Sequence, residues 1–285
     1  IYEEIPGLKI VFTGSSVMRL KEENPELNNI VKSYNLRGFS FREFLNLKTG
    51  NHFRPYTLDE ILRNHERIVK DILPKVSPLS FFQDYLHHGF YPFFQEQRNY
   101  SENLLKTMNM VTEVDILLIK QIELKYLTKI KKLFYLLALE GNKAPNVSWL
   151  AQEIETSRAT VMNYIKYLAD ARLTNMIYPK GCEFPKKPSK VMMHNTNLMY
   201  AIYPIAVKRQ DVMETFFVNT MWKDHNVNQG AKDDFYLVDG SLKFKICNAN
   251  DFEKKKFRQD TIYARYNTEV GKDNLIPLWL LGFLY

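Results

Sequence analysis

The sequence has few cysteines and no long apolar run. Its two cysteines, Cys182 and Cys247, lie far apart and have no partners at metal-binding spacing. We therefore expect two free thiols in a reducing, cytoplasmic compartment, and neither a disulfide framework nor a metal site. No apolar run approaches the roughly 20 residues that a membrane-spanning helix needs, so we predict no membrane partner. No secretory signal peptide is recognised, although the chain starts at Ile1 rather than Met.

Residues 146–173, NVSWLAQEIETSRATVMNYIKYLADARL, have the pattern of a helix, a tight turn and a second helix. The first helix is predicted over residues 148–155. Thr156 or Ser157 can cap the second helix, which starts near Arg158. The apolar residues of the second helix that recur at helical spacing, and are expected to face a core, are Val161, Ile165 and Leu168.

The other side chains of the second helix suit a DNA major groove. Short polar side chains and cations at the start of such a helix can contact base edges and phosphates. The candidate DNA-binding residues, including two lysines of the following segment, are Ser157, Arg158, Thr160, Asn163, Lys166, Lys186 and Lys187. The alternative is a three-helix packing unit, with its first helix over residues 126–139, that contacts no nucleic acid.

Two short strand-like runs follow, at residues 173–178 and 190–194, and the basic segment PKGCEFPKKPSK connects them. Two strands after a recognition helix form the wing of a winged helix, so duplex DNA is the predicted partner. Residues 126–195 hold eleven lysines and arginines and five acidic residues. The difference of 11 − 5 = +6 is most of the chain's formal net charge of +7. This clustering is typical of nucleic-acid binding, and a solvated basic face is the alternative.

An apolar run near the N-terminus, LKIVFT at residues 8–13, is rich in β-branched side chains. It predicts a buried strand of a parallel sheet. Ser15 and Ser16 follow it, and ligands of open α/β sheets bind at the carboxyl ends of strands. The two serines are therefore candidates for contact with a phosphate or a water, and the alternative is a strand-to-helix turn that either serine caps.

The chain is long enough, at 285 residues with 45% apolar and 25% charged, for two or three small domains. Further helices are predicted over residues 56–73, 80–86, 99–121, 199–207 and 212–221. A hairpin is predicted from residues 235–238 and 242–247, joined by Asp239-Gly240, and a terminal strand from residues 276–284. The adjacent His87 and His88 point apart on a helix, so they are not expected to share a metal ion.

Several segments together resemble one protein family. They are TGSS at 13–16, GFSFREFL at 38–45, YLHHGFYP at 85–92, SRATVMNYIKYLADARL at 157–173, KPSKVMMHNTNLMYAI at 187–202, DDFYLVDGSLKF at 233–244 and IPLWLLGFLY at 276–285. Their combination resembles the predicted AAA+ superfamily ATPases, in which a P-loop domain is joined to a winged helix and a C-terminal domain of unknown function. The resemblance spans nearly the whole chain.

The resemblance implies a mixed α/β fold in four parts. They are a remnant of an AAA+ ATPase core (1–75), a helical lid (76–125), a winged helix (126–196) and a restriction-endonuclease-like α/β domain (197–285). It also implies ATP and Mg²⁺ as cofactors of the full-length family, with Ser15 and Ser16 at a sensor-like position near the γ-phosphate. Arginines that the family carries shortly before the equivalent of Tyr34 are missing, and the nearby Arg37 and Arg42 are expected to be structural.

The chain looks like the C-terminal part of such an ATPase. It has no G-x-x-x-x-G-K-[ST] phosphate loop, and no apolar strand ending in an Asp-Glu pair precedes residue 8. Because nucleotide hydrolysis needs both, we expect no cofactor and no independent catalysis in this chain.

The nuclease-like part also departs from an active metal site. That chemistry needs an acidic residue on one strand and an acidic-x-Lys arrangement on the next. Asp234 takes the first position, but Lys245 stands where a carboxylate is needed, and Ala249 where relatives often have lysine. We therefore expect an inactive nuclease-like domain.

Three functional interpretations remain open. The favoured one is the C-terminal part of an AAA+-like ATPase that binds duplex DNA or a protein partner. The second is a stand-alone DNA-binding or regulatory module. The third and least favoured is a metal-dependent nuclease.

Overall fold

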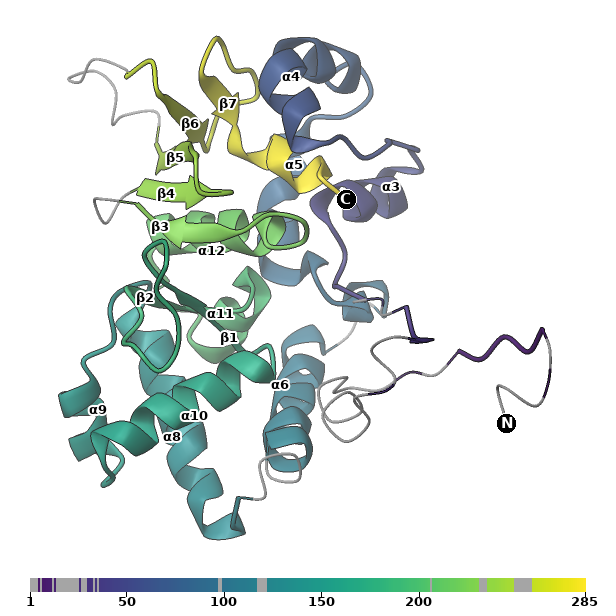
Figure 1. Cartoon of the computed structure of the whole chain (residues 1–285). Coiled ribbons are helices and arrows are strands. Elements are labelled where there is room, and N and C mark those ends of the chain that lie inside the picture. The colour runs from purple at the N-terminus through teal and green to yellow at the C-terminus, as the bar shows by residue number, and fades with distance from the viewer. Residues whose placement is uncertain are drawn as a thin grey trace.

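The computed structural model of the chain describes residues 5, 7–11, 13, 26, 30–32, 34, 36–96, 99–116, 122–205, 207–230, 235–248 and 258–285. The described residues form helices and two β-sheets, so the fold is mixed α/β, as predicted (Figure 1). Buried apolar side chains from all along this part of the chain belong to one hydrophobic cluster.

The first part of the chain is helical. Its elements are α3 (Phe41–Thr49), α4 (Leu58–Ile72), α5 (Pro78–Asp84), a π-helical turn η1 (Tyr85–Gly89) and a 3₁₀ turn η2 (Pro92–Gln95). α3 begins after Ser40, whose hydroxyl accepts a hydrogen bond from the Glu43 amide while the Glu43 carboxylate accepts one from the Ser40 amide. Thr57 and Glu60 cap α4 in the same way. These reciprocal bonds satisfy backbone donors that would otherwise be unpaired, and so they set where each helix starts.

The middle of the chain contains further helices and a two-stranded sheet. Its elements are α6 (Tyr100–Met110), η3 (Val111–Ile116), η4 (Leu124–Tyr126), α8 (Leu127–Glu140), α9 (Val147–Glu153), α10 (Arg158–Asp170), β1 (Thr174–Ile177) and β2 (Lys190–Met193). α10 packs against α8, α9 and β1. β1 and β2 are antiparallel, with Thr174 opposite Met193.

The last part of the chain contains the larger sheet. Its elements are α11 (Thr196–Ile202), α12 (Arg209–Met221), β3 (Val227–Gln229), β4 (Phe235–Val238), β5 (Leu242–Cys247), β6 (Thr261–Arg265), β7 (Leu275–Pro277) and the 3₁₀ helix η6 (Leu278–Phe283). The strand order is β3-β4-β5-β6-β7, antiparallel as far as β5 and parallel from β5 to β7. α12 packs against β5, while η6 returns to α3 and α4. The Tyr56 amide donates a 2.9 Å hydrogen bond to the Phe283 carbonyl at this return.

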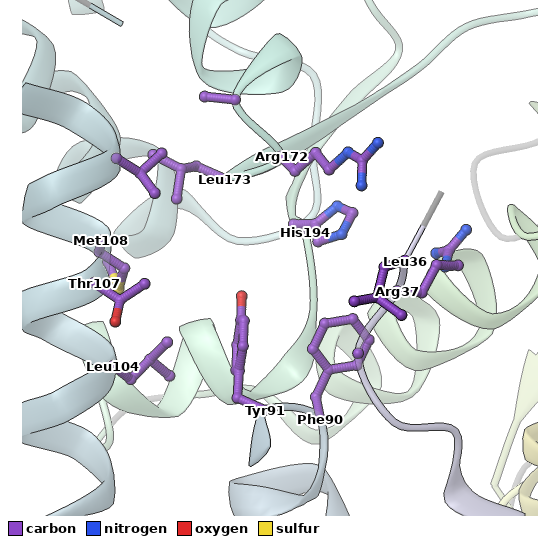
Figure 2. Close-up of a pocket in the computed structure, with 13 residues that line it drawn as sticks. Leu36, Arg37, Phe90, Tyr91, Leu104, Thr107, Met108, Arg172, Leu173 and His194 are labelled. Carbon is purple, nitrogen blue, oxygen red and sulfur yellow. The ribbon is translucent and has the colours of Figure 1, made fainter. Parts of the chain in front are cut away.

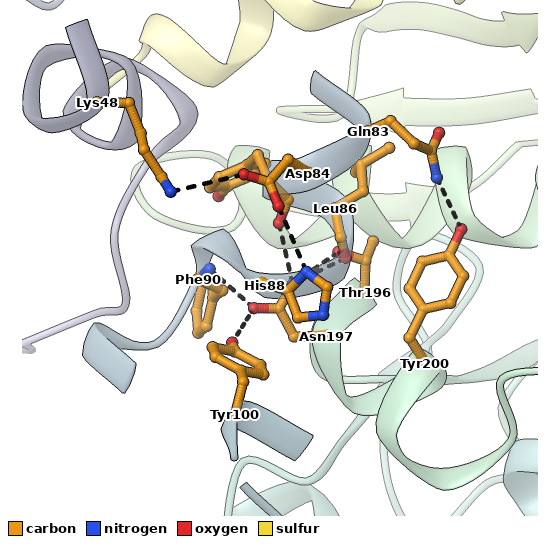
Figure 3. A network of polar contacts seen from close by, with 11 residues as sticks. Lys48, Gln83, Asp84, Leu86, His88, Phe90, Tyr100, Thr196, Asn197 and Tyr200 are labelled. Carbon is orange, nitrogen blue, oxygen red and sulfur yellow. Dashed lines mark hydrogen bonds and ion pairs between the residues drawn. The ribbon is translucent and has the colours of Figure 1, made fainter. Parts of the chain in front are cut away.

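Asn197 of α11 fastens the π-helical turn to the rest of the molecule (Figure 3). Its Oδ1 accepts a hydrogen bond from the Phe90 amide at 2.8 Å and another from the Tyr100 hydroxyl. Its Nδ2 donates to the carbonyls of Leu86 at 2.8 Å and Tyr85 at 3.1 Å. A π-helical turn leaves some backbone amides and carbonyls without the partners that a regular α-helix provides. The buried side-chain amide of Asn197 pairs with several of these groups.

The predicted hairpin is confirmed with the predicted bounds. β4 and β5 pair antiparallel, with Val238 opposite Leu242. Asp239 and Gly240 between them both have positive φ, 48° and 70°. Ser241 completes the connection, and its amide donates to the Val238 carbonyl. A turn with two consecutive positive φ angles matches the twist of the flanking strands, which explains why the Asp-Gly pair was informative.

Two predicted strands are wrong. Of residues 8–13, the described ones are not in a strand, and Ile10 and Val11 are 53% and 90% exposed. An apolar run is buried as a strand only where neighbouring strands cover it, and in the part of the chain that is described no strand pairs with these residues. Residues 276–284 form only the end of β7 and then η6, which is fully buried. A run without periodicity does not distinguish a strand from a buried helix.

Among the described residues, no helix combines the length and the hydrophobicity that crossing a bilayer requires.

Candidate nucleic-acid interface

The turn between α9 and α10 orients the second helix. Glu155 in this turn has a positive φ of 50°, and Ser157 caps α10 by accepting a 3.1 Å hydrogen bond from the Thr160 amide. The predicted core residues of α10 are confirmed as buried, and with Tyr164 they are Val161, Ile165 and Leu168. The helix therefore packs one face on α8 and α9 and leaves the opposite face toward solvent.

The predicted DNA-binding residues of α10 lie on the outward face, but they differ in solvent exposure and in whether they already form an ion pair within the protein. Ser157, Arg158 and Asn163 are exposed, whereas Thr160 and Lys166 are half-buried. No hydrogen bond or ion pair joins the Arg158 side chain to another described residue. The Lys166 ammonium, in contrast, forms an ion pair with Asp170 one turn along the same helix. Arg158 is therefore the cation of α10 that is free to meet a ligand.

Much of the basic surplus of this region is used inside the protein. The Lys129 ammonium donates to the Glu155 carbonyl at 2.6 Å, and the Lys132 ammonium donates to the Glu153 carbonyl. These carbonyls lie at the C-terminal end of α9, where the helix dipole favours a cation. Other lysines of the surplus that form ion pairs are Lys131 with Glu113, Lys143 with Glu140 and Lys190 with Glu214. The sequence count thus overstates the charge available to a ligand.

The loop between β1 and β2 carries the remaining predicted contacts. Lys186 and Lys187 are exposed in this loop. Glu183 and Phe184 of the same loop line a groove together with Lys166 of α10. The structure thus brings the loop beside the outward face of α10, although the two are separate in sequence.

The other predicted site residues do not join this surface. Ser15, Ser16 and Asp234 lie outside the described residues. Lys245, where a nuclease needs a carboxylate, lies on β5 with its ammonium 5.0 Å from the centre of the Phe235 ring. Within the described part of the chain, no group of three or more His, Cys, Asp and Glu side chains is arranged to hold a metal ion.

Arg37 and Arg42 have the structural contacts that were expected. The Arg37 guanidinium donates to the Asn219 carbonyl at 2.7 Å, and the Arg42 guanidinium donates to the Tyr285 carbonyl at 2.9 Å. Both bonds join the segment around α3 to the C-terminal part of the fold.

A cavity of about 210 Å³ lies at the other end of α10, where the chain leaves the helix (Figure 2). Side chains of α6 form one of its walls, namely Leu104, Thr107 and Met108. Across the cavity from them lie Arg37, Arg172 and His194. The Tyr91 hydroxyl points between the two walls and accepts a 2.8 Å hydrogen bond from Asn195.

Most of the candidate interface and of the cavity lies in a segment that is similar to a known family of domains. Residues 80–206 match a family described as a domain of unknown function, DUF8612. The match includes α10, the β1–β2 loop and the whole cavity except residues 36–38.

The chain is also similar to the uncharacterized protein MJ1637 of Methanocaldococcus jannaschii, with 28% identity over 178 residues. The matching region covers 60% of this chain and 37% of that protein, so the chain spans well under half the length of its curated relative. No solved structure matches the chain.

The cavity residues were not predicted as a site. Arg37, Arg172 and His194 come from three segments that are distant in sequence, and none carries a recognisable local motif. Arg172 has a positive φ of 58°, which is unusual for an arginine, but the local sequence does not predict this conformation.

His194 is held in its neutral form. Its Nδ1 lies 3.0 Å from Asn175 Oδ1. Burial, followed by the charges of Arg37 and Arg172, lowers the pKa of His194 to about 3. An imidazole in this position adds no charge to the cavity at physiological pH.

We expect His194 to make the protein less stable in acid. The unfolded chain binds a proton below about pH 6.5, and the folded chain does not until about pH 3. The free energy of unfolding should therefore fall by at most about 1.4 kcal/mol per pH unit between these values. Denaturation at pH 7 and pH 5 should show a smaller difference for His194→Gln than for the unchanged protein. His52→Gln, at an exposed position, is the matched control, and an NMR titration of His194 near pH 6.5 would contradict the assignment.

Proposed function

We propose that this chain binds duplex DNA as a winged helix, with α10 as the recognition helix and the β1–β2 loop as the wing. The observation that carries the proposal is the exposed polar group at the start of α10, where Arg158 has no partner among the described residues. Ser157 and Asn163 flank it on the outward face. The first turns of a recognition helix are where side chains reach base edges in the major groove.

The arrangement of the wing supports the same proposal. Lys186 and Lys187 are exposed in a loop that lies beside α10, so both elements can follow one duplex. Lysines on such a loop contact phosphates, which position the protein without reading the sequence. The recognition helix supplies the sequence-dependent contacts, and the loop supplies affinity that depends on salt.

The proposal assigns no catalytic step to this chain. A nuclease needs clustered carboxylates to hold Mg²⁺, and Lys245 places a cation against an aromatic ring at the position in question. In keeping with the resemblance to AAA+ ATPases, we propose that ATP hydrolysis belongs to a P-loop domain outside this chain. DNA binding by the winged helix would then be its contribution to the larger protein.

Arg158→Gln should weaken binding of a labelled duplex about tenfold and reduce the slope of log K against log salt by about 1, because one phosphate or base contact is lost. Lys166→Gln should have a smaller effect, since Asp170 already neutralises that lysine. Fluorescence anisotropy at two salt concentrations measures both quantities.

Arg67→Gln is the matched control for this experiment, because Arg67 is an exposed arginine on α4, far from α10 (Figure 1). The control should leave affinity and salt slope unchanged. Equal losses in Arg67→Gln and Arg158→Gln would show non-specific attraction only. No binding at low salt would make α8, α9 and α10 a packing unit without a DNA contact.

A further inference from the structure

The groove beside α10 continues across β1 toward β3. It consists of two adjoining hollows of about 550 and 600 Å³, which share Met176, Tyr178 and Trp222 as lining residues. The first hollow reaches α10 and the second reaches β3, so the groove crosses β1 between these elements (Figure 1). Each hollow lies within the ~300–1,000 Å³ range of sites that hold drug-sized ligands, and a nucleotide is of that size. Together the two hollows form the aromatic groove.

The aromatic side chains at the centre of this groove come from backbone that is fixed by hydrogen bonds. Tyr178 directly follows β1, and its carbonyl accepts a 2.8 Å hydrogen bond from the Gln229 amide of β3. Trp222 directly follows α12, and its amide donates a 3.0 Å hydrogen bond to the Val218 carbonyl. Because the backbone on both sides is already ordered, a ligand that binds there causes little further loss of conformational entropy.

Three aromatic rings line the groove and keep part of their surface accessible. The side chains of Tyr178, Phe184 and Trp222 are half-buried. Among the described residues none of the three contacts another ring, whereas the core rings of Phe82 and Phe216 meet edge to face with centroids 4.9 Å apart. Partly accessible rings of this kind offer a surface on which bases of any identity can stack.

The loop between β1 and β2 supplies cations at the edge of the groove. It carries three exposed lysines, namely Lys180, Lys186 and Lys187. The Lys180 ammonium donates to the Gly240 carbonyl at 3.1 Å, and the Lys186 ammonium lies 3.9 Å from the Cys182 sulfur. None of the three lysines forms an ion pair with a described residue. Their charge is therefore available to phosphate groups.

The carboxylates that line the groove oppose this charge only in part. Asp170 pairs with the Lys166 ammonium, and Asp239 pairs with His225 at 2.7 Å, so both are bound within the protein. The third, Glu183, is exposed in the same loop as the three lysines. The charge that remains for a ligand is positive, which favours an anionic chain over a neutral one.

We propose that the aromatic groove binds single-stranded DNA, as unpaired nucleotides that continue from the duplex on α10. Bases stack on Trp222 and Tyr178, and the lysines of the β1–β2 loop bind the phosphates. The groove reaches Lys166 on the outward face of α10, so the two binding surfaces are continuous. This inference rests on the proposed function and names its substrate class, which is a junction between double-stranded and single-stranded DNA.

The test compares labelled DNAs that share one duplex, by fluorescence anisotropy. One duplex is blunt, one carries a single-stranded extension of about six nucleotides, and one carries an abasic extension of the same length. The extension should raise affinity about tenfold over the blunt duplex, because bases stack on the groove. The abasic extension has the same phosphates but no bases, so it should give at most a small part of this gain. Extensions at the 5′ and the 3′ end show which strand polarity fits.

Two variants locate the extension in the groove. Trp222→Leu and Tyr178→Leu each remove a stacking surface and should remove most of the gain from the extension, while Trp222→Phe keeps a ring and should retain it. Tyr135→Leu is the matched control, because Tyr135 is a 45% exposed tyrosine of α8 outside the groove. Stacking on Trp222 should also quench tryptophan fluorescence, and this quenching should be missing in Trp222→Leu.

The proposal is overturned if the extension adds no affinity, if the abasic extension adds as much, or if the gain survives both Trp222→Leu and Tyr178→Leu. Should Trp222→Leu fail to fold, as seen by circular dichroism, Tyr178→Leu and Trp222→Phe decide the question.

Two results separate this inference from the proposed function. Blunt-duplex binding that falls in Arg158→Gln but does not rise with an extension would keep the proposed function and exclude the groove. Binding of the single strand alone that is lost in Trp222→Leu, with no binding of the blunt duplex, would contradict the proposed function and leave the groove as the site.

Discussion

Lys190→Met should lower the free energy of unfolding by ~3–5 kcal/mol, because it leaves the Glu214 carboxylate buried without its cation. Lys190 of β2 and Glu214 of α12 are 8% and 7% exposed, and their charged groups are 2.8 Å apart. The Tyr236 hydroxyl of β4 donates a 2.5 Å hydrogen bond to the same carboxylate oxygen. Burial and the Glu214 charge raise the pKa of Tyr236 well above its usual value, so it stays a donor.

Chemical denaturation measures this loss, and a double variant separates charge from packing. Replacing both partners, as in Lys190→Met with Glu214→Leu, removes the buried charges together and should recover most of the lost stability. The matched control is Lys243→Met, which breaks an exposed 2.5 Å pair with Asp260 and should cost less than ~1 kcal/mol. A loss below ~1 kcal/mol in Lys190→Met itself would show that the pair is not buried in solution.

Asn197→Ala should destabilise the protein by about 3 kcal/mol. The change leaves the Phe90 amide and the Tyr85 carbonyl without their buried partner, and each unsatisfied group costs roughly 1–3 kcal/mol when no water replaces the bond. The Leu86 carbonyl loses one of two bonds and keeps the 2.7 Å bond from the Thr196 hydroxyl. Asn197 is 1% exposed, which leaves little access for water. Denaturation gives the total loss, and hydrogen exchange at the Phe90 amide should show that protection is lost at this position.

Two further variants serve as comparisons for Asn197→Ala. Tyr100→Phe removes one of the bonds to Asn197 Oδ1 and should cost about 1 kcal/mol. Gln83→Ala removes the exposed 3.3 Å hydrogen bond to Tyr200 on the same side of the molecule and should cost less than about 0.5 kcal/mol. An unchanged exchange rate at Phe90 in Asn197→Ala would mean that the π-helical turn does not depend on this side chain.

Patterns that depend on neighbouring residues predicted structure well. Helical spacing located the buried face of α10, since Val161, Ile165 and Leu168 recur every three or four residues. The Asp239-Gly240 turn located β4 and β5 because few residues tolerate two consecutive positive φ angles. Where the run was uniformly apolar, as in residues 276–284, local pattern failed and the contacts of η6 with α3 and α4 decided the conformation.

The sequence by itself determined where the helices of the candidate interface lie and which side of α10 faces the core. Only the tertiary structure decided which cations are available, because Lys129 and Lys132 reach carbonyls at the end of α9 that the sequence does not place near them. It alone also brought Arg37, Arg172 and His194 to one cavity wall. The physical reason is the same in both cases: periodicity and capping act over a few residues, whereas charge pairing and cavity formation depend on contacts between distant segments.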